Sequence, residues 1–252
     1  MNTIRITRQL AVDLAPLVFA PPVTHVYNPL EYAWEPHCRY LERYGLGPRP
    51  VLLIGMNPGP WGMAQTGIPF GDPVMVRDWL ALEGVVKQPP GLHPKRPVEG
   101  FACRRREVSG SRLWGWARDW FETPDRFFRY FFVINFCPLC LFDLAGKNIT
   151  PNQLPMKDRH PLEEICGRAL RRYLDYYQPD YVIGVGEFAE RQIRAVLNSH
   201  AITVGRIPHP NPANPSANRG WSEAVARHFE ALGILARIRP DIKKGAVSGG
   251  MK

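Results

Sequence analysis

The sequence has few cysteines and no long hydrophobic run, and both shortages exclude classes of protein. Its cysteines are Cys38, Cys103, Cys137, Cys140 and Cys166. An odd number of cysteines without a secretion signal indicates reduced thiols inside a cell and excludes a disulfide-rich secreted domain. Asp13 and Pro16 interrupt the apolar stretch at the amino terminus, which therefore does not resemble a signal peptide. The longest apolar run, YFFVINFCPLCLF, is too short for a membrane span and contains Asn135.

Acidic residues are also scarce relative to basic ones. The chain of 252 residues carries 23 Asp and Glu against 32 Lys and Arg, which gives a net charge of +9. This excess favours a polyanionic partner such as nucleic acid, although net charge says nothing about the fold. Hydrophobic residues make up 45% of the chain, which is enough for a full core. We therefore expect a soluble intracellular protein with no membrane segment.

Short apolar segments alternate with amphipathic helical patterns along the chain. Segments rich in Val, Ile and Phe that end in turn residues are predicted strands, at 50–58, 131–138, 180–186 and 201–210. Apolar positions three and four apart predict helices over 111–121, 160–177, 187–197 and 216–233. The alternation predicts an α/β fold in which helices cover both faces of an open parallel sheet.

The remaining segments set the expected domain organisation. We find no internal repeat and no second core, so we expect a single domain over residues 1–239. Residues 240–252 are predicted to form a disordered tail. The stretch 86–106 is a long, basic, Pro-rich loop, and loops of this length inside a compact domain are more often functional than idle.

Unusual polar residues stand at the ends of three predicted strands. These residues are Asn57, Asn135 and His209. Ligands of open α/β sheets bind outside the carboxyl ends of the strands, so we expect these three side chains to converge. An Asn amide can pair with a base edge that presents a carbonyl beside an N–H, as uracil does. An imidazole can donate a hydrogen bond to a base carbonyl that becomes negative as a glycosidic bond breaks.

Each of these residues also has an ordinary structural interpretation. Asn135 could cap local backbone, and His209 could be a loop histidine with one hydrogen bond. The neighbourhood of His209 favours the functional alternative, because four prolines stiffen the segment 208–215 just before a predicted helix. A rigid loop of this kind suits a wedge that is pushed into stacked DNA. Phe70 could stack on a base or simply pack, and Met63 could line a pocket or fill the core.

Two long motifs resemble those of a known family. GMNPGPWGMAQTGIPFG and HPNPANPSANRGW are similar to the signature motifs of the single-strand-selective monofunctional uracil-DNA glycosylases. CRRREVSGSRLWGW, VINFCPL and YVIGVG also resemble segments of that family. The similarity keeps its order and spacing from about Tyr27 to Arg237.

The resemblance implies a fold and an activity. The implied fold is a three-layer α/β/α sandwich around a four-stranded parallel sheet. The implied activity is the hydrolysis of the N-glycosidic bond of damaged pyrimidines in DNA, chiefly uracil and 5-hydroxymethyluracil, which leaves an abasic site without strand cleavage. The implied enzyme uses no metal and no cofactor and acts as a monomer on single- or double-stranded DNA. It would lie in the cytoplasm with the nucleoid of a bacterium, or in the nucleus of a eukaryote.

The resemblance also assigns roles to residues of this chain. Asn57 would hold the attacking water, and His209 would stabilise the departing uracil anion at its O2. Asn135 would bind the Watson–Crick edge of the flipped base. The remaining substrate-binding residues would be Met56, Gly59, Met63 and Phe70, of which Gly59 and Met63 border the 5-position of the base and Phe70 stacks on it. The DNA wedge would consist of Asn211, Pro212, Ala213, Asn214, Pro215, Asn218, Arg219 and Gly220.

The wedge of this chain departs from the family pattern at one position. Animal members carry an arginine where this sequence has Ala213. A methyl group cannot fill a gap of nucleobase size or hold a phosphate. This difference predicts weaker binding of duplex DNA, or transfer of the wedge role to Asn214 or Arg219. Basic residues at the protein surface would bind the DNA backbone; the candidates are Lys95, Arg96, Arg104, Arg105 and Arg106.

Several alternatives stay open at this level. Cys137 and Cys140 form a C-x-x-C pair, but an iron–sulfur cluster needs four thiolates and no second close pair exists. GVGEFAE lacks the third glycine of a dinucleotide-binding loop. A nucleic-acid-binding protein without catalysis would share the basic charge and the wedge, but it would have no need of three polar groups around a base pocket. A glycosylase mainly for deaminated purines is a further alternative.

Overall fold

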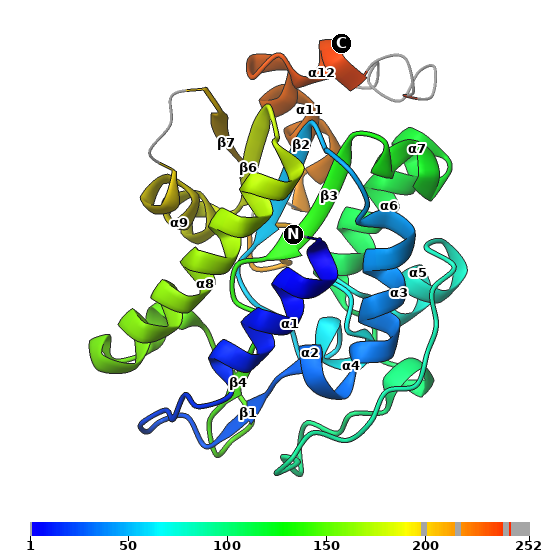
Figure 1. Cartoon of the computed structure of the whole chain (residues 1–252). Coiled ribbons are helices and arrows are strands. Elements are labelled where there is room, and N and C mark those ends of the chain that lie inside the picture. Colours follow the sequence, from blue (N-terminus) through cyan, green and yellow to red (C-terminus); the bar gives the residue numbers. More distant parts are fainter. Residues whose placement is uncertain (1, 198–200, 215–217, 239–241, 243–252) are drawn as a thin grey trace.

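The computed structural model describes residues 2–197, 201–214, 218–238 and 242 (Figure 1). Most of the predicted tail, and Pro215 of the predicted wedge, lie outside the described residues. No helix in the described ranges is long and apolar enough to cross a membrane. All five cysteines are free thiols.

The centre of the molecule is a parallel sheet of four strands. These are β2 (Val51–Gly55), β3 (Phe131–Asn135), β6 (Tyr181–Val185) and β7 (Thr203–Ile207). Their order across the sheet is β3-β2-β6-β7, and every neighbouring pair is parallel. Each strand falls within a predicted segment. β2, β3 and β6 are almost fully buried, which explains their continuous apolar runs, whereas β7 at the edge of the sheet has exposed residues.

Neighbouring aromatic residues of β3 show how helices cover both faces of this sheet. Successive strand residues point to opposite faces. Phe131 packs against Trp116 of α6 (Val108–Phe121) and Phe229 of α11 (Trp221–Ala231). Phe132 packs against Tyr40 of α3 (Trp34–Tyr44) and, on the same face, Tyr177 of α8 (Met156–Tyr177). The expected three-layer α/β/α architecture is therefore confirmed (Figure 1).

Other helices complete the two outer layers. α9 (Glu187–Val196) connects β6 to β7, and α1 (Thr3–Leu14) packs beside α8. The shorter helices are α2 (Pro29–Tyr32), α4 (Met63–Thr66), α5 (Pro73–Asp78), α7 (Pro124–Phe128) and α12 (Ile234–Ile238), with single 3₁₀ turns η1 (Gly100–Ala102) and η2 (Pro151–Gln153).

A second, smaller sheet was not anticipated from the sequence. Its strands β1 (His25–Tyr27), β4 (Cys140–Phe142) and β5 (Asn148–Ile149) pair antiparallel in the order β1-β4-β5. The strands have only two or three residues, too few for an alternating pattern to be recognised. The run YFFVINFCPLCLF is therefore two strands in different sheets, joined by residues 136–139.

Candidate active site

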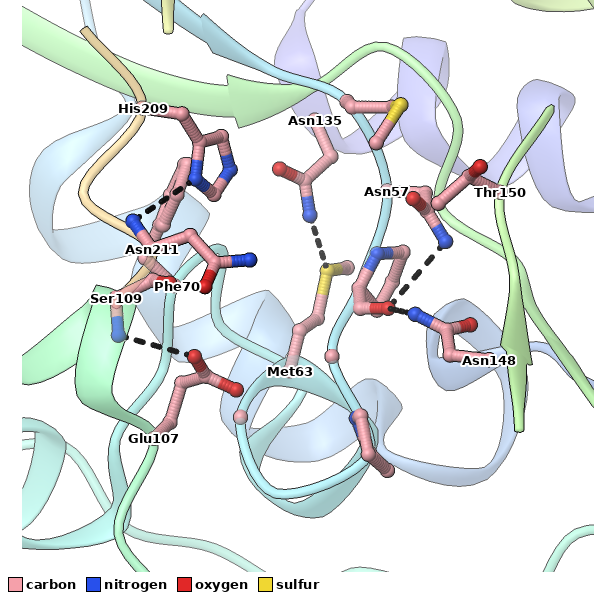
Figure 2. Close-up of a pocket in the computed structure, with 15 residues that line it drawn as sticks. Asn57, Met63, Phe70, Glu107, Ser109, Asn135, Asn148, Thr150, His209 and Asn211 are labelled. Carbon is pink, nitrogen blue, oxygen red and sulfur yellow. Dashed lines mark hydrogen bonds between the residues drawn. The ribbon is translucent and has the colours of Figure 1, made fainter. Parts of the chain in front are cut away.

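One pocket lies at the carboxyl ends of β2, β3 and β7 (Figure 2). Its volume is about 240 Å³, far more than one water molecule needs. It is lined by Met56, Asn57, Pro58, Gly59, Pro60, Gly62, Met63, Phe70, Glu107, Ser109, Asn135, Asn148, Thr150, His209 and Asn211. Asn57, Asn135 and His209, which are far apart in the sequence, thus share one cavity. Every residue that the resemblance assigns to catalysis or base binding lies on its wall.

The sheet register fixes the position of Asn135. Asn135 is the last residue of β3 and pairs with Gly55 of β2. A Cβ atom at Gly55 would collide with Asn135 Oδ1, so only glycine leaves room for this amide. The amide Nδ2 contacts Met63 Sδ at 3.3 Å. Because a thioether is a weak acceptor, Nδ2 can exchange this contact for a hydrogen bond to a ligand.

His209 is held as a neutral imidazole with a defined tautomer. Burial lowers the pKa of His209 to about 4, so the ring is uncharged at neutral pH. The backbone N–H of Asn211 donates to Nδ1 at 3.1 Å, which makes Nδ1 an acceptor and places the proton on Nε2. The ring can therefore offer one N–H donor to a group in the pocket.

Phe70 provides an apolar wall beside His209. The two ring centroids lie 6.1 Å apart. Phe70 has a φ of 53°, in the left-handed region that residues other than glycine rarely adopt. Two glycines accommodate this arrangement, because a Cβ at Gly110 would collide with the Phe70 carbonyl and one at Gly55 would lie 2.7 Å from its ring. The orientation of the ring is thus set by close backbone packing.

The opposite wall is formed by Asn57 and by residues that the sequence did not reveal. Asn57 comes two residues after β2 and contacts the Pro58 carbonyl at 3.4 Å through Nδ2. Asn148 of β5 donates to the same carbonyl at 3.2 Å, and Thr150 lies nearby (Figure 2). Asn148 and Thr150 could not be found from the sequence, because the small sheet that brings them to the pocket was not predicted.

Glu107 and Ser109 are also pocket residues that sequence reasoning missed. Ser109 donates its backbone N–H to Glu107 Oε1 at 3.1 Å, which caps the start of α6. Burial raises the pKa of the Glu107 carboxyl. The predicted helix began at residue 111, whereas α6 begins at Val108. The N-cap is Glu107, whereas the usual N-cap residues are Ser, Thr, Asp and Asn, so the sequence carried no clear signal for this helix start.

The loop after His209 lies beside the pocket. Of its described residues only Asn211 lines the cavity; Pro212, Ala213, Asn218 and Arg219 are exposed. Asn214 donates to the His209 carbonyl at 3.0 Å, so its side chain contributes to the structure of the loop. Gly220 precedes α11 with a φ of 112°, which favours glycine.

Arg112 supports this loop from α6, a contact that the sequence did not suggest. Its guanidinium donates to the Pro210 carbonyl at 3.0 Å and to Asn218 Oδ1 at 2.8 Å. The amide of Asn218 in turn donates to the Pro212 carbonyl at 2.7 Å. The loop is therefore held at three points by one arginine and its partner.

The basic loop differs from expectation at Arg106. Arg106 Nε donates to Asp72 Oδ2 at 2.8 Å, and Asp72 is fully buried. This pair joins α5 to the start of α6, so Arg106 has a structural role; its side chain is still half exposed, and phosphate binding by Arg106 stays a prediction. Arg96 and Arg105 lie over the ring of Trp61, with guanidinium carbons 5.4 and 4.3 Å from its centroid.

The cysteines of the C-x-x-C pair are buried. Cys140 donates weakly to the Pro58 carbonyl at 3.5 Å, and Cys137 lies in the core. In the part of the chain that the structure describes, no three His, Cys, Asp or Glu side chains are grouped so that they could hold a metal ion.

Comparisons with known proteins agree with this architecture. The family model described as the uracil DNA glycosylase superfamily matches residues 44–232. The single-strand selective monofunctional uracil DNA glycosylase of Bos taurus is 48% identical over 225 residues, covering 88% of this chain and 83% of the relative. The Rattus norvegicus protein of that name is 47% identical over 229 residues, covering 90% and 82%.

A solved structure supports the fold independently. The crystal structure of wild-type SMUG2 from Pedobacter heparinus aligns with a TM-score of 0.64 and 18% identity, covering 94% of this chain and 99% of that one. At this identity the likeness concerns the fold alone. The family itself is shown by the family model and by the relatives that are 47–48% identical. This chain belongs to the uracil-DNA glycosylase superfamily and, within it, to the family of single-strand-selective monofunctional uracil-DNA glycosylases.

Proposed function

We propose that this protein extrudes uracil or a 5-substituted uracil from DNA and hydrolyses its N-glycosidic bond, leaving an abasic site and an intact strand. The observation that carries the proposal is the meeting of Asn57, Asn135 and His209 around one cavity of about 240 Å³. A protein that only bound DNA would gain nothing from two amides and a neutral imidazole that line one cavity. Chemistry on a base requires such a cavity, because the reacting bond is inaccessible in a stacked duplex.

In this proposal Asn135 and Phe70 bind the base. Asn135 pairs with N3–H and O4 of the pyrimidine, because its planar amide offers an acceptor and a donor side by side. Phe70 stacks on the ring, with Met56 and Met63 closing the space around it. A pyrimidine without this pairing would leave buried polar groups unsatisfied, which costs about 1–3 kcal/mol for each group.

His209 stabilises the leaving group. As the bond between C1′ and N1 breaks, the base keeps the electron pair and becomes an anion. The Nε2–H of neutral His209 donates to its O2, where much of that charge collects. A neutral donor suits this role, because it does not need to be desolvated as a cation.

Asn57 positions the water that completes the reaction. An amide is a poor general base, so the water adds late, to a sugar that is already cationic. The water oxygen bonds to C1′, its proton passes to solvent, and the product is an abasic sugar. Replacement of Asn57 by Asp should therefore leave excision measurable.

A direct test uses single-stranded and duplex oligonucleotides with one uracil. Incubation with the protein and then hot alkali should cleave the strand at the uracil, whereas no cleavage should precede the alkali treatment. A panel with 5-hydroxymethyluracil, 5-formyluracil and hypoxanthine defines the base range. Stable binding without release of any base would contradict the proposal.

The exposed methyl of Ala213 leads to a separate prediction about duplex DNA. Ala213 lies in the loop that we propose as the wedge, where its N–H donates to Asn211 Oδ1 at 2.9 Å. Arginine at this position can fill the gap left by the extruded base and pair with a phosphate. Ala213→Arg should raise duplex uracil excision about tenfold, as expected for about 1–2 kcal/mol from a new charge-assisted contact.

The single-stranded substrate is the internal control for this variant. In single-stranded DNA the extruded base leaves no gap between paired strands. The rate of uracil excision from this substrate should therefore change much less than the rate from duplex DNA. Equal rates and affinities of Ala213→Arg and the wild type on duplex DNA would rule out the proposed role of the loop.

We further propose that residues 1–239 act as one domain, as a monomer, in a compartment that keeps thiols reduced. One buried cluster that includes residues from Ile6 to Ile238 supports the first point. Five free cysteines, four of them buried, are compatible with the last.

A further inference from the structure

Glu107 is the only acidic residue that lines the pocket in the described part of the chain. It is fixed at both its backbone and its side chain. Its N–H donates to Asp72 Oδ2 at 2.9 Å, and its Oε1 accepts from the N–H of Ser109 at 3.1 Å. A carboxyl held in this way does not behave as a mobile surface group, so its position on the wall is part of the shape of the pocket.

Two glycines of the loop after Asn57 leave space for this carboxyl. A Cβ at Gly59 would lie 2.5 Å from Glu107 Oε2, and one at Gly62 would lie 2.9 Å from Glu107 Cγ. Any side chain at either position would displace the glutamate. Helix capping uses only Oε1, whereas Oε2 lies against Gly59, which also lines the pocket.

The position of Glu107 relative to Asn135 shows which edge of a base it would face. In a pyrimidine that pairs with Asn135 through N3 and O4, the amide Nδ2 donates to O4, and this Nδ2 lies 3.3 Å from Met63 Sδ. C5 is bonded to C4, so a substituent at C5 lies on the same side of the base as Met63 and the preceding Gly62. A Cβ at Gly62 would lie 2.9 Å from Glu107 Cγ, so Glu107 lies on the C5 side of the base and not on its N3 side.

A carboxylate at this edge discriminates by hydrogen-bond character. An ionised carboxylate only accepts hydrogen bonds. A base that enters the pocket displaces water from the Glu107 carboxylate. The hydrogen bonds lost with this water are replaced only if the base supplies a donor. The C5–H of uracil is not such a donor, the O–H of a hydroxymethyl group is, and a formyl group offers only an acceptor.

We propose that Glu107 determines specificity at C5, favouring uracils whose substituent donates a hydrogen bond over those whose substituent only accepts one. This inference rests on the proposed function, because it assumes that a pyrimidine occupies the cavity with its Watson–Crick edge on Asn135. The burial that raises the pKa of Glu107 is consistent with this role, since the carboxylate is short of solvation that a ligand donor can supply.

Glu107→Gln tests the assignment with little change in shape. The amide oxygen must stay at the Oε1 position to accept from Ser109, so the new NH₂ group takes the place of Oε2 and presents a donor. The single-turnover rates on 5-formyluracil and 5-hydroxymethyluracil are measured in the same single-stranded sequence. The formyl-to-hydroxymethyl rate ratio of the variant should exceed that of the wild type by about tenfold or more.

This ratio is insensitive to loss of folded enzyme, because both substrates are measured with the same preparation. Glu99→Gln is the matched control: Glu99 is exposed, lies outside the pocket and gives the same change in charge. Its ratio should equal that of the wild type.

The outcomes separate this inference from the proposed function. An unchanged ratio in Glu107→Gln overturns the specificity role, including the case in which both rates fall together. Failure of the wild type to release any of these bases contradicts the proposed function itself, and it is seen before a variant is made.

Discussion

Replacing His209 with alanine is expected to lower the single-turnover rate of uracil excision from a single-stranded oligonucleotide by about 10²–10³-fold, the usual cost of removing one donor aimed at developing negative charge. The tautomer fixed by Asn211 places the N–H on Nε2. Alanine removes this donor while the pocket stays open, so the chemical step should suffer more than binding. The measurement is the rate at saturating enzyme, followed by alkali cleavage.

Two comparisons make this result specific to the imidazole. His160→Ala removes an exposed histidine of α8, and its rate should match the wild type. His209→Gln restores an N–H donor and should recover part of the loss. Near-full activity of His209→Ala would show that leaving-group stabilisation comes from elsewhere.

The pH dependence follows from the same donor. The pKa of His209 is lowered from 6.5 to about 4, so the ring is neutral throughout the range from pH 6 to 8. Protonation, which would take Nδ1 away from the Asn211 N–H, begins only as the pH approaches 4. The His209-dependent rate should therefore be flat from pH 6 to 8. A change centred near pH 6.5 that is absent from His209→Ala would mean that a charged imidazole takes part.

Replacing Asn135 with leucine is expected to reduce kcat/KM for uracil by about 10²–10⁴-fold, because two buried polar groups of the base lose their partners at about 1–3 kcal/mol each. Leucine has nearly the same shape but neither donor nor acceptor. Asn135 ends β3 against Gly55, so the backbone should keep its register. The loss should be similar for every uracil derivative, since all share N3–H and O4.

Abasic DNA provides the control for Asn135→Leu. The product strand has no base to pair, so the variant and the wild type should bind it with equal affinity. A parallel loss of abasic-site affinity would indicate a damaged fold, which a thermal unfolding midpoint would detect. Wild-type kcat/KM in a folded Asn135→Leu variant would place the Watson–Crick edge elsewhere.

The sheet and the principal polar residues could be predicted from the sequence because their signals are local. Buried parallel strands give continuous apolar runs, and Asn57, Asn135 and His209 stand out where those runs end. Parallel strands share one carboxyl edge, so the proximity of the three residues follows from the fold class without coordinates. The two long motifs then indicated the family, which the comparisons confirm.

The residues that were missed depend on contacts between distant segments. Asn148 reaches the pocket through a strand of two residues, which has no recognisable pattern. Arg112 is one of many arginines, and only the structure shows it holding Pro210 and Asn218. Glu107 and Arg106 are adjacent in the sequence, yet one lines the pocket and the other pairs with buried Asp72. Charge and composition could not separate these roles.

The most direct test is a crystal structure with a single-stranded oligonucleotide that carries a non-hydrolysable uracil nucleotide. We expect the base inside the cavity at the ends of β2, β3 and β7, with N3 and O4 on the Asn135 amide and O2 within hydrogen-bonding distance of His209 Nε2. Asn57 should face C1′ with room for one water. A base bound outside this cavity, or turned so that neither Asn135 nor His209 touches it, would show that these residues do not form the base-binding site.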